Sequence, residues 1–427
     1  MKSQGPSGSP LHHTTRGILA LSFAVGLLLT GCPKNTETAE ESEPLPEAQR
    51  GSFSEKEAET SERPERSLDP TSLKNMSELL AGIVPANDPT VQDGEEVPAL
   101  DPVWQEHARV MDEIWQGIEP RHELMSGWSE ETLAELPDPD ATLLYPFGGP
   151  DLVTALSFFP DARSYLLVGL EAPGRLPLPE KFSGTALADD LAKLRGAFGS
   201  MAQSGYFVRT QIDRGVTDGA FDGVLPILLI CLVRGDQVPV AVEYVSFDRD
   251  TQELRSLPSE QTKASAVRVL FRSRSGEQGA TRSVYYFAQD LSNRGLHADD
   301  PFAELLRRQE SLNVYMKAAE YLLHTSDFLQ FRKILLSESQ LILQDDSGVP
   351  IRHFTSNRWQ LRFYGSYTDV LAAYKPFYQE DLAAAFAKQT TPLPFRIGYG
   401  ASGDGGGMIL ATRNGEASST PGSPPER

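Results

Sequence analysis

The feature that most limits how this chain can fold is a long acidic stretch near its N-terminus. Residues 33–100 hold sixteen Asp or Glu residues, six Lys or Arg residues and a single aromatic residue, Phe53. Such a stretch buries too little apolar surface to offset the entropy that ordering costs, and its like charges favour extension. We therefore predict a disordered acidic linker over residues 32–100, in which only residues 76–84 could form one or two helical turns.

If the linker ends at residue 100, the folded part of the protein lies after it. Residues 101–412 are long enough for one large core or two intimate subdomains, and they contain no evident internal repeat. A tail rich in Gly, Ser and Pro completes the chain. We predict a globular domain over residues 101–412 and a disordered tail over residues 413–427.

The residues ahead of the linker have the layout of an export signal. Lys2 and Arg16 carry positive charge before an apolar stretch that is too short for an ordinary membrane span. The stretch ends in Leu-Thr-Gly-Cys at residues 29–32, which resembles the lipobox of bacterial lipoproteins. The resemblance implies a signal peptide over residues 1–31, a diacylglycerol thioether on Cys32 and an amino-terminal acyl chain such as palmitate. The alternative is an ordinary secretory signal with a chance cysteine.

The lipobox resemblance also predicts where the protein resides. Two or three acyl chains on one residue anchor it firmly, because each buried methylene contributes about 0.8 kcal/mol. Pro33, rather than Asp, follows Cys32. By the sorting rules of Gram-negative lipoproteins, this favours the periplasmic face of the outer membrane over the inner membrane. We therefore expect a lipid-anchored protein of the cell envelope, whose first partner is the membrane itself.

Charge and cysteine content exclude other classes of protein. The formal net charge is −20, so the phosphates of a nucleic acid would repel the chain, and no nucleic-acid partner is predicted. Once Cys32 is acylated, Cys231 has no disulfide partner, and its apolar surroundings at residues 228–233 indicate a buried side chain rather than a nucleophile. We find no motif that predicts a cofactor.

Helical and strand patterns alternate irregularly within the predicted domain. Apolar spacing predicts helices over residues 110–118, 187–201, 312–323, 328–335 and 379–388. Strands are predicted over residues 164–170, 238–247, 266–273, 283–288, 341–343, 359–364 and 395–399. Residues 266–288 have the pattern of a hairpin and no regular βαβ alternation is visible, so we predict an α+β fold with a mixed or antiparallel sheet and packed helices.

The sharpest polar signal is Gln-Asp-Asp-Ser-Gly-Val-Pro at residues 344–350, directly after a predicted strand. Two adjacent carboxylates at a strand end could act as an acid/base pair or hold a cation. We interpret Asp345 and Asp346 as candidate catalytic residues and Ser347 and His353 as candidate binding residues. The alternative is an Asx turn, since Asp, Ser, Gly and Pro are all common turn residues.

A second polar signal is Tyr-Pro-Phe-Gly-Gly-Pro-Asp at residues 145–151. Asp151 could cap a helix that begins at the next residue, or it could bind a ligand from a stiff loop. Glu171 ends another predicted strand and is a third catalytic candidate, although a strand-end carboxylate often only marks where a strand meets water. His324 and His353 lack the spacing of a metal motif such as His-Glu-x-x-His, so no metal site is predicted.

These motifs together resemble an uncharacterised family of exported bacterial proteins and lipoproteins. The resemblance rests on residues 145–151, 168–171, 316–324, 344–350 and 364–367, and it spans roughly residues 140–400. No activity is established for that family. The resemblance therefore implies that the polar clusters belong to one module, but it supplies no mechanism.

Three functions fit the sequence. The first is a membrane-anchored binding or structural module, which could recognise envelope glycan or an envelope protein. The second is an envelope-acting hydrolase that uses Asp345 and Asp346, with Glu171 and Asp151 nearby. The third, a part of an export machine, rests on location alone. Convergence of the carboxylates and His353 on one concave site would favour the hydrolase.

Overall fold

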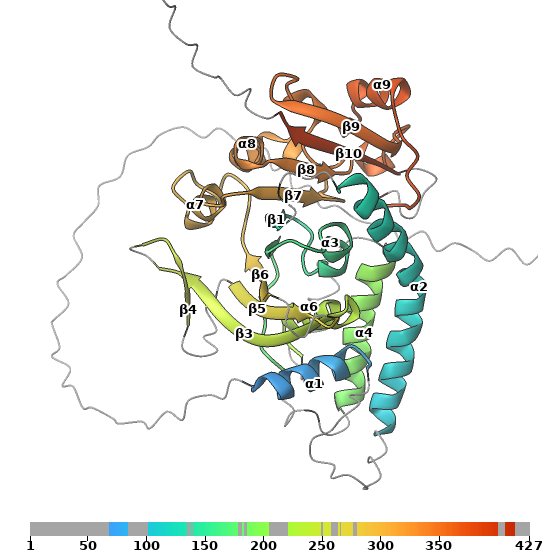
Figure 1. Ribbon diagram of the computed structural model, residues 1–427, viewed down its shortest axis with the longest axis vertical. Helices are drawn as coiled ribbons and strands as arrows, with labels where there is room; N and C mark the ends of the chain where they lie inside the picture. The colour runs from blue at the N-terminus through green and yellow to red at the C-terminus, as the bar shows by residue number, and fades with distance from the viewer. Residues whose placement is uncertain are drawn as a thin grey trace, which may run out of the picture. The chain divides into compact units, whose positions relative to one another are not determined.

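The structure, a computed structural model, contains one large mixed sheet with helices on both faces (Figure 1). It describes residues 68–83, 101–134, 138, 140–177, 182, 186–204, 221–248, 251–257, 264, 266–275, 280–399 and 406–414, all within one compact unit. The predicted signal peptide, Cys32, residues 33–67 and 84–100 of the predicted linker, and the tail beyond residue 414 lie outside the described residues.

Ten strands form the sheet in the order β4-β3-β5-β6-β2-β1-β7-β8-β10-β9. In chain order they are β1 (Thr142–Tyr145), β2 (Ser164–Gly169), β3 (Gln237–Phe247), β4 (Leu254–Ser256), β5 (Ala266–Ser273), β6 (Arg282–Ala288), β7 (Leu312–Met316), β8 (Leu341–Gln344), β9 (Trp359–Ser366) and β10 (Gly406–Arg413). The five central strands, from β6 to β8, run parallel to one another. Antiparallel pairs add β5, β3 and β4 at one end and β10 and β9 at the other.

The parallel centre has the strand order of a doubly wound fold. Counted along the chain, its strands stand third, second, first, fourth and fifth across the sheet. The chain therefore moves to one side of β1 and later returns to build β7 on the other side, where Leu144 pairs with Leu166 and with Val314. The position between β1 and β7 is a topological switch point, and open parallel sheets bind ligands at such points, beyond the carboxyl ends of the strands.

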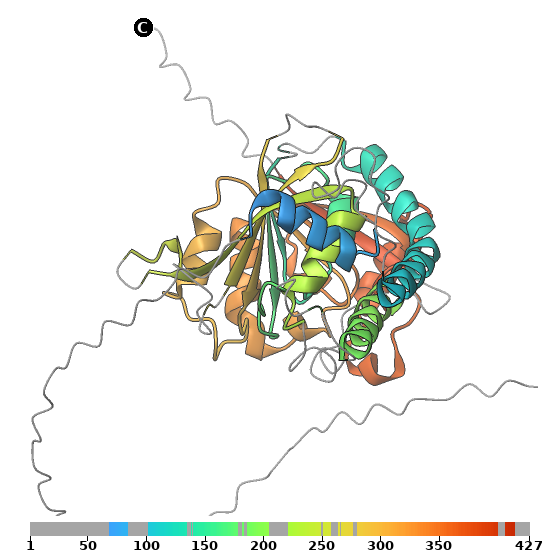
Figure 2. The same cartoon turned by 90° about the horizontal axis from the view of Figure 1, so that it is seen from below.

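Two layers of helices cover the sheet. The helices are α1 (Pro70–Leu80), α2 (Pro102–Thr132), α3 (Leu152–Phe158), α4 (Ala186–Ser204), α6 (Leu225–Arg234), α7 (Pro301–Arg307), α8 (Leu329–Glu338) and α9 (Glu380–Lys388). One core lies between the sheet and α1, α2, α3, α4 and α6, and a second lies between the sheet and α7 and α8. Figure 2 shows the teal and green helices α2 and α4 together on one side of the sheet. Along β1, Leu143 and Tyr145 enter the first core and Leu144 the second, as the pleat of a strand requires.

The predicted α+β fold with a mixed sheet and packed helices is confirmed. The predicted hairpin is present as the antiparallel pair β5 and β6, and four of the five predicted helices correspond to α2, α4, α8 and α9. The five parallel strands were not anticipated. Their first βαβ unit is built from a strand of 4 residues and a helix of 7, which are too short for their periodicity to be recognised.

The prediction of a helix over residues 312–323 is wrong. Leu312–Met316 form strand β7, and only Leu322–His324 turn into a short 3-10 helix, η2. All five residues of β7 are buried, because a central parallel strand has a core on each face and therefore no polar face. Residues 395–399, which the structure describes, also form no strand, contrary to the prediction.

The prediction of a linker over residues 32–100 is wrong for residues 68–83. Helix α1 buries Leu73, Met76 and Leu80 in the core that it shares with α6 and β3. Glu78 is also buried, and its carboxylate lies 2.9 Å from the guanidinium of Arg274. The spacing of the three apolar residues is that of a helical stripe, but the surrounding charge obscured it. The folded domain therefore starts at least as early as residue 68.

Candidate functional site

The carboxyl ends of the parallel strands bring most of the predicted site residues to one edge of the sheet. Asp151 follows β1, Glu171 follows β2, and Asp345 and Asp346 follow β8. Lys317 directly follows β7. Because β1 and β7 are neighbours, the groups that follow these two strands face each other across the switch point.

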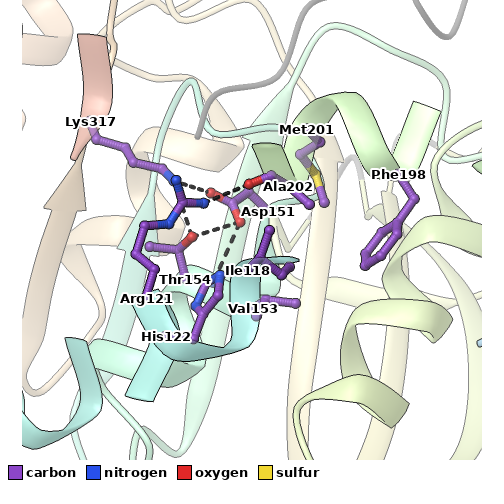
Figure 3. Close-up of a pocket in the computed structure, with 10 residues that line it drawn as sticks. All are labelled: Ile118, Arg121, His122, Asp151, Val153, Thr154, Phe198, Met201, Ala202 and Lys317. Atoms are coloured by element: carbon purple, nitrogen blue, oxygen red, sulfur yellow. Dashed lines mark hydrogen bonds and ion pairs between the residues drawn. The ribbon is translucent and has the colours of Figure 1, made fainter. Parts of the chain in front are cut away.

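Asp151 and Lys317 form a buried ion pair at the switch point (Figure 3). Lys317 Nζ lies 2.7 Å from Asp151 Oδ2 and donates to Thr154 Oγ1 at 3.0 Å. Tyr145 donates its hydroxyl hydrogen to Asp151 Oδ2 at 3.0 Å, while Asp151 Oδ1 accepts from the backbone and the hydroxyl of Thr154. The side chains of Lys317 and Asp151 are only 4% and 7% exposed. The predicted helix cap at Asp151 is confirmed, and the same carboxylate also neutralises a lysine.

Sequence reasoning did not single out Lys317. The mistaken helix over residues 312–323 placed Lys317 among ordinary polar positions. In the structure Lys317 follows the buried strand β7, so its side chain lies at the carboxyl ends of the parallel strands. Burial lowers the pKa of Lys317, and the adjacent Asp151 opposes that change. The available signal was its position: Lys317 is the first charged residue after an apolar run, where a central strand would end.

Helix α2 closes the switch point from the side (Figure 3). Arg121 donates to the carbonyl oxygen of Ala202 near the end of α4 at 2.6 Å, and His122 Nδ1 lies 2.9 Å from Ser157 Oγ. Burial lowers the pKa of His122 to about 4, although Asp151 favours its charged form. The cavity that remains among these side chains has a volume of about 10 Å³, enough for about one water molecule. The chain's own side chains therefore fill the switch point.

Asp345 fills a second polar recess, between the ends of β7 and β8. Its Oδ2 accepts from the N–H of Ala318 at 2.7 Å, and its Oδ1 accepts from the N–H of Ser347 at 3.0 Å and from the Ser347 hydroxyl. Ser347 Oγ in turn accepts from the N–H of Ala319 at 2.7 Å. Burial raises the pKa of Asp345, and the hydrogen bonds from Ser347 and Ala318 oppose that rise. This geometry is the Asx turn of the alternative interpretation.

The backbone that receives Asp345 has an uncommon conformation. Ala318, Glu320 and Tyr321 have φ angles of 48°, 50° and 55°, in the left-handed region that non-glycine residues rarely adopt. Successive N–H groups in such turns form a concave surface that attracts anions. The Asp345 carboxylate and the Ser347 hydroxyl occupy this surface, so here too the chain supplies its own acceptor.

Asp346 lies in a different environment, which is aromatic rather than cationic. It accepts a hydrogen bond from the hydroxyl of Tyr321, whose ring stacks on Phe377 at 5.5 Å and on Tyr399 at 6.3 Å between centroids. Burial, together with the neighbouring Asp345, raises the pKa of Asp346 to about 7. A carboxyl group that titrates near neutral pH can accept or donate a proton, so the acidity of Asp346 suits the predicted catalytic role.

Glu171 and His353 do not join these groups through their contacts. Glu171 Oε2 accepts from the Tyr286 hydroxyl on β6 and from the backbone of Leu170, both at 3.2 Å. His353 lies in the 3-10 helix η4 (Ile351–His353), and its pKa is lowered by burial and by two nearby arginines. The convergence that would favour a hydrolase is therefore only partial, since Asp151 and Asp345 share the field of Lys317 but Glu171 and His353 have partners elsewhere.

A larger hollow lies at the opposite edge of the sheet. Its volume is about 270 Å³, its lining includes Thr142, Arg163 and Ser311 at or just before strand starts, and it contains none of the predicted site residues. Within the described ranges, no three His, Cys, Asp or Glu side chains gather where they could hold a metal ion. The part of the chain that the structure describes also has no helix of the length and hydropathy needed to cross a bilayer.

Comparisons of the chain with protein-family models, with curated proteins and with solved structures gave no match. Membership of the exported family that the motifs resemble therefore stays a prediction. The function has to be argued from the geometry of this chain alone.

Proposed function

We propose that this protein is a lipoprotein of the bacterial cell envelope whose folded domain is a binding or structural module. The Leu-Thr-Gly-Cys sequence supports acylation at Cys32, and Pro33 favours the periplasmic face of the outer membrane. Because α1 belongs to the domain, the linker between the lipid anchor and the folded domain, called the leash below, is shortened to residues 33–67. At about 3.3–3.6 Å per residue, this leash reaches at most about 120 Å.

The closed switch point is the observation that carries the choice of a module over an enzyme. A doubly wound sheet binds its ligand between the carboxyl ends of its strands, and a small-molecule pocket usually needs about 300 Å³ or more. Here the ion pair of Asp151 with Lys317 and the hydrogen-bonded Asp345 leave a cavity of about 10 Å³. Recognition of envelope glycan or an envelope protein is therefore assigned to the outer surface of the domain.

An envelope hydrolase is the second candidate, and one observation favours it. The pKa of Asp346 is raised to about 7, and its side chain is only partly buried, so it could exchange a proton with a bound substrate. Asp345 would then set the acidity of Asp346 rather than act directly, because its own oxygens already accept three hydrogen bonds.

Acylation is tested by making the full chain with its own signal in a Gram-negative host. We expect mass spectrometry to find Cys32 at the new N-terminus with lipid attached, and membrane fractionation to place the protein in the outer membrane. The matched control is Cys32→Ser, which should stay unacylated and leave the membrane fraction. An unmodified Cys32 in a correctly exported protein would refute the anchor.

The choice between module and hydrolase is tested with the purified protein and isolated envelope glycan and lipid. We expect the wild-type protein to bind an envelope component without converting it. Turnover that is lost on Asp346→Asn, and that survives the surface change Asp369→Asn, would overturn the module and establish the hydrolase.

A further inference from the structure

The connection between β9 and α9 carries an exposed apolar and aromatic surface. Leu371 is 47% exposed and Tyr378 is 37% exposed, and Ala372, Ala373 and Pro376 between them are exposed as well. Among the described residues, five large hydrophobic side chains are exposed, and these two share one segment of eight residues. The other three lie singly on α2, after β2 and on α8. Single exposed hydrophobic residues are ordinary, but a cluster marks an interaction surface.

The domain holds this segment in a fixed shape. Its 3-10 helix η5 (Ala372–Phe377) turns two rings inward, so that Tyr374 and Phe377 pack on Tyr321 with centroids 4.8 Å and 5.5 Å away. The segment is then tied down at Gln379, whose N–H donates to the hydroxyl of Tyr367 at 3.0 Å. The Tyr378 ring stacks on Tyr367, with 5.4 Å between the centroids, and leaves part of its surface exposed near Leu371. The exposed side chains therefore stand on a preorganised turn, which lowers the entropy cost of docking.

Charge separates this surface from the rest of the chain. Lys375, the only charged residue in residues 371–378, forms an ion pair with Asp369 just before the segment, so the pair leaves this surface without net charge although the chain carries −20. A neutral surface of Leu, Tyr and Pro with one lysine is the composition that favours the interface of a bilayer, where tyrosine rings and lysine stems span apolar and wet layers.

We propose that residues 371–378 dock on the interface of the bilayer that holds the lipid anchor. This inference rests on the proposed acylation of Cys32. The leash joins the domain at α1, which packs on β3, whereas the segment follows β9 at the other end of the sheet. Ten strands span about 45 Å at their usual spacing, and the leash can reach about 120 Å, so the anchor and the segment can engage the same membrane. Anchoring raises the local concentration of bilayer, so a weak contact is sufficient.

The test places a polarity-sensitive fluorophore on the segment of the full, acylated chain in phosphatidylcholine vesicles. Ala373→Cys receives the label, because Cys231 is buried and Cys32 is acylated. Ala192→Cys, at an exposed position on α4, is the matched control. We expect the label at 373 to shift to the blue and to be quenched by lipids that carry a quencher, and the label at 192 to show neither effect. Adding Leu371→Glu, at the more exposed of the two large apolar side chains, should abolish both signals at 373 while the thermal unfolding curve stays unchanged.

Other outcomes decide against the docking in distinct ways. Equal quenching at 373 and 192, or none at either while the protein floats with the vesicles, overturns the docking and leaves the anchor intact. A blue shift at 373 that grows with protein concentration without vesicles assigns the surface to a second copy instead. If the chain fails to float with the vesicles, the proposed anchor is wrong. The labelled Cys32→Ser chain is then mixed with a large excess of vesicles. A blue shift of the label at 373 supports the docking, and its absence overturns it.

Discussion

Replacement of Asp346 by Asn should make the domain more stable at pH 8, and the gain should be less than half as large at pH 5. Burial and the adjacent Asp345 raise the pKa of Asp346 from 3.8 to about 7. The folded state therefore binds a proton that the unfolded state has already released above pH 4, and stability falls as pH rises through this window. Asn keeps the neutral form at every pH, and its amide oxygen can still accept from the Tyr321 hydroxyl.

The size of the effect follows from the same pKa change. An elevation of roughly three pH units corresponds to at most about 4 kcal/mol at 1.36 kcal/mol per unit. The side chain of Asp346 is partly exposed and shares its titration with Asp345, so the field around it is screened. We expect a gain of about 1–2 kcal/mol at pH 8, which raises the melting temperature of a domain of this size by a few degrees.

Urea unfolding of the two proteins at pH 5, 6, 7 and 8 measures the effect as a difference between their midpoints. The matched control is Asp369→Asn, because Asp369 is exposed and its ion pair with Lys375 and hydrogen bonds lower its pKa, away from this window. A wild-type protein that is more stable than Asp346→Asn at pH 8 would show that the ionised carboxylate is the stable form. That result would refute the reasoning and point to a cation that binds Asp346.

Three further predictions concern the switch point and the domain boundary. Lys317→Met should cost about 3–5 kcal/mol of unfolding free energy in urea titrations, because it leaves the Asp151 carboxylate buried without its partner, and adding Asp151→Asn should recover much of that loss. Gly148→Ala should lower the unfolding free energy by about 1–3 kcal/mol, because the added Cβ would lie 2.3 Å from the Tyr145 ring, whereas Gly117→Ala, where a Cβ meets no atom, should not destabilise. A chain that starts at residue 101 should melt well below one that starts at residue 68, because it lacks the buried side chains of Leu73, Met76 and Leu80, each worth about 1.5–3 kcal/mol of burial, and exposes the core surface on which they pack. Equal melting temperatures would show that residues 68–83 do not contribute to the stability of the folded domain.

The fold class could be predicted from the sequence because the longer elements keep their periodicity. The hairpin β5 and β6 shows the apolar alternation of strands, and α4 keeps an apolar stripe at helical spacing. The doubly wound centre could not be predicted in the same way. Strands such as β7 are buried on both faces, so nothing polar marks their period, and their pairing depends on residues far apart in the sequence.

The candidate site was predicted in part for a related reason. Asp151 and Asp345 were recognised because turn and cap residues follow strands in a local pattern, and both make the contacts of a cap or an Asx turn. Lys317 was missed because its role exists only when β1 and β7 are neighbours. The elevated pKa of Asp346 likewise depends on burial, and the segment around Phe377 and Gln379 that packs there arrives about thirty residues later, which no local pattern reveals.

The closed edge of the sheet gives a physical reason to seek recognition elsewhere on this domain. A helix start, a turn with exposed N–H groups and a lysine are the features with which doubly wound sheets attract anionic ligands. In this chain the carboxylate of Asp151 pairs with the lysine and caps the helix start, and the carboxylate of Asp345 accepts from the N–H groups of the turn. An incoming anion would have to displace a buried carboxylate and leave it without its donors, at a cost of several kcal/mol. The edge therefore stabilises the fold, and the exposed segment at residues 371–378 is the stronger candidate for contact with the envelope.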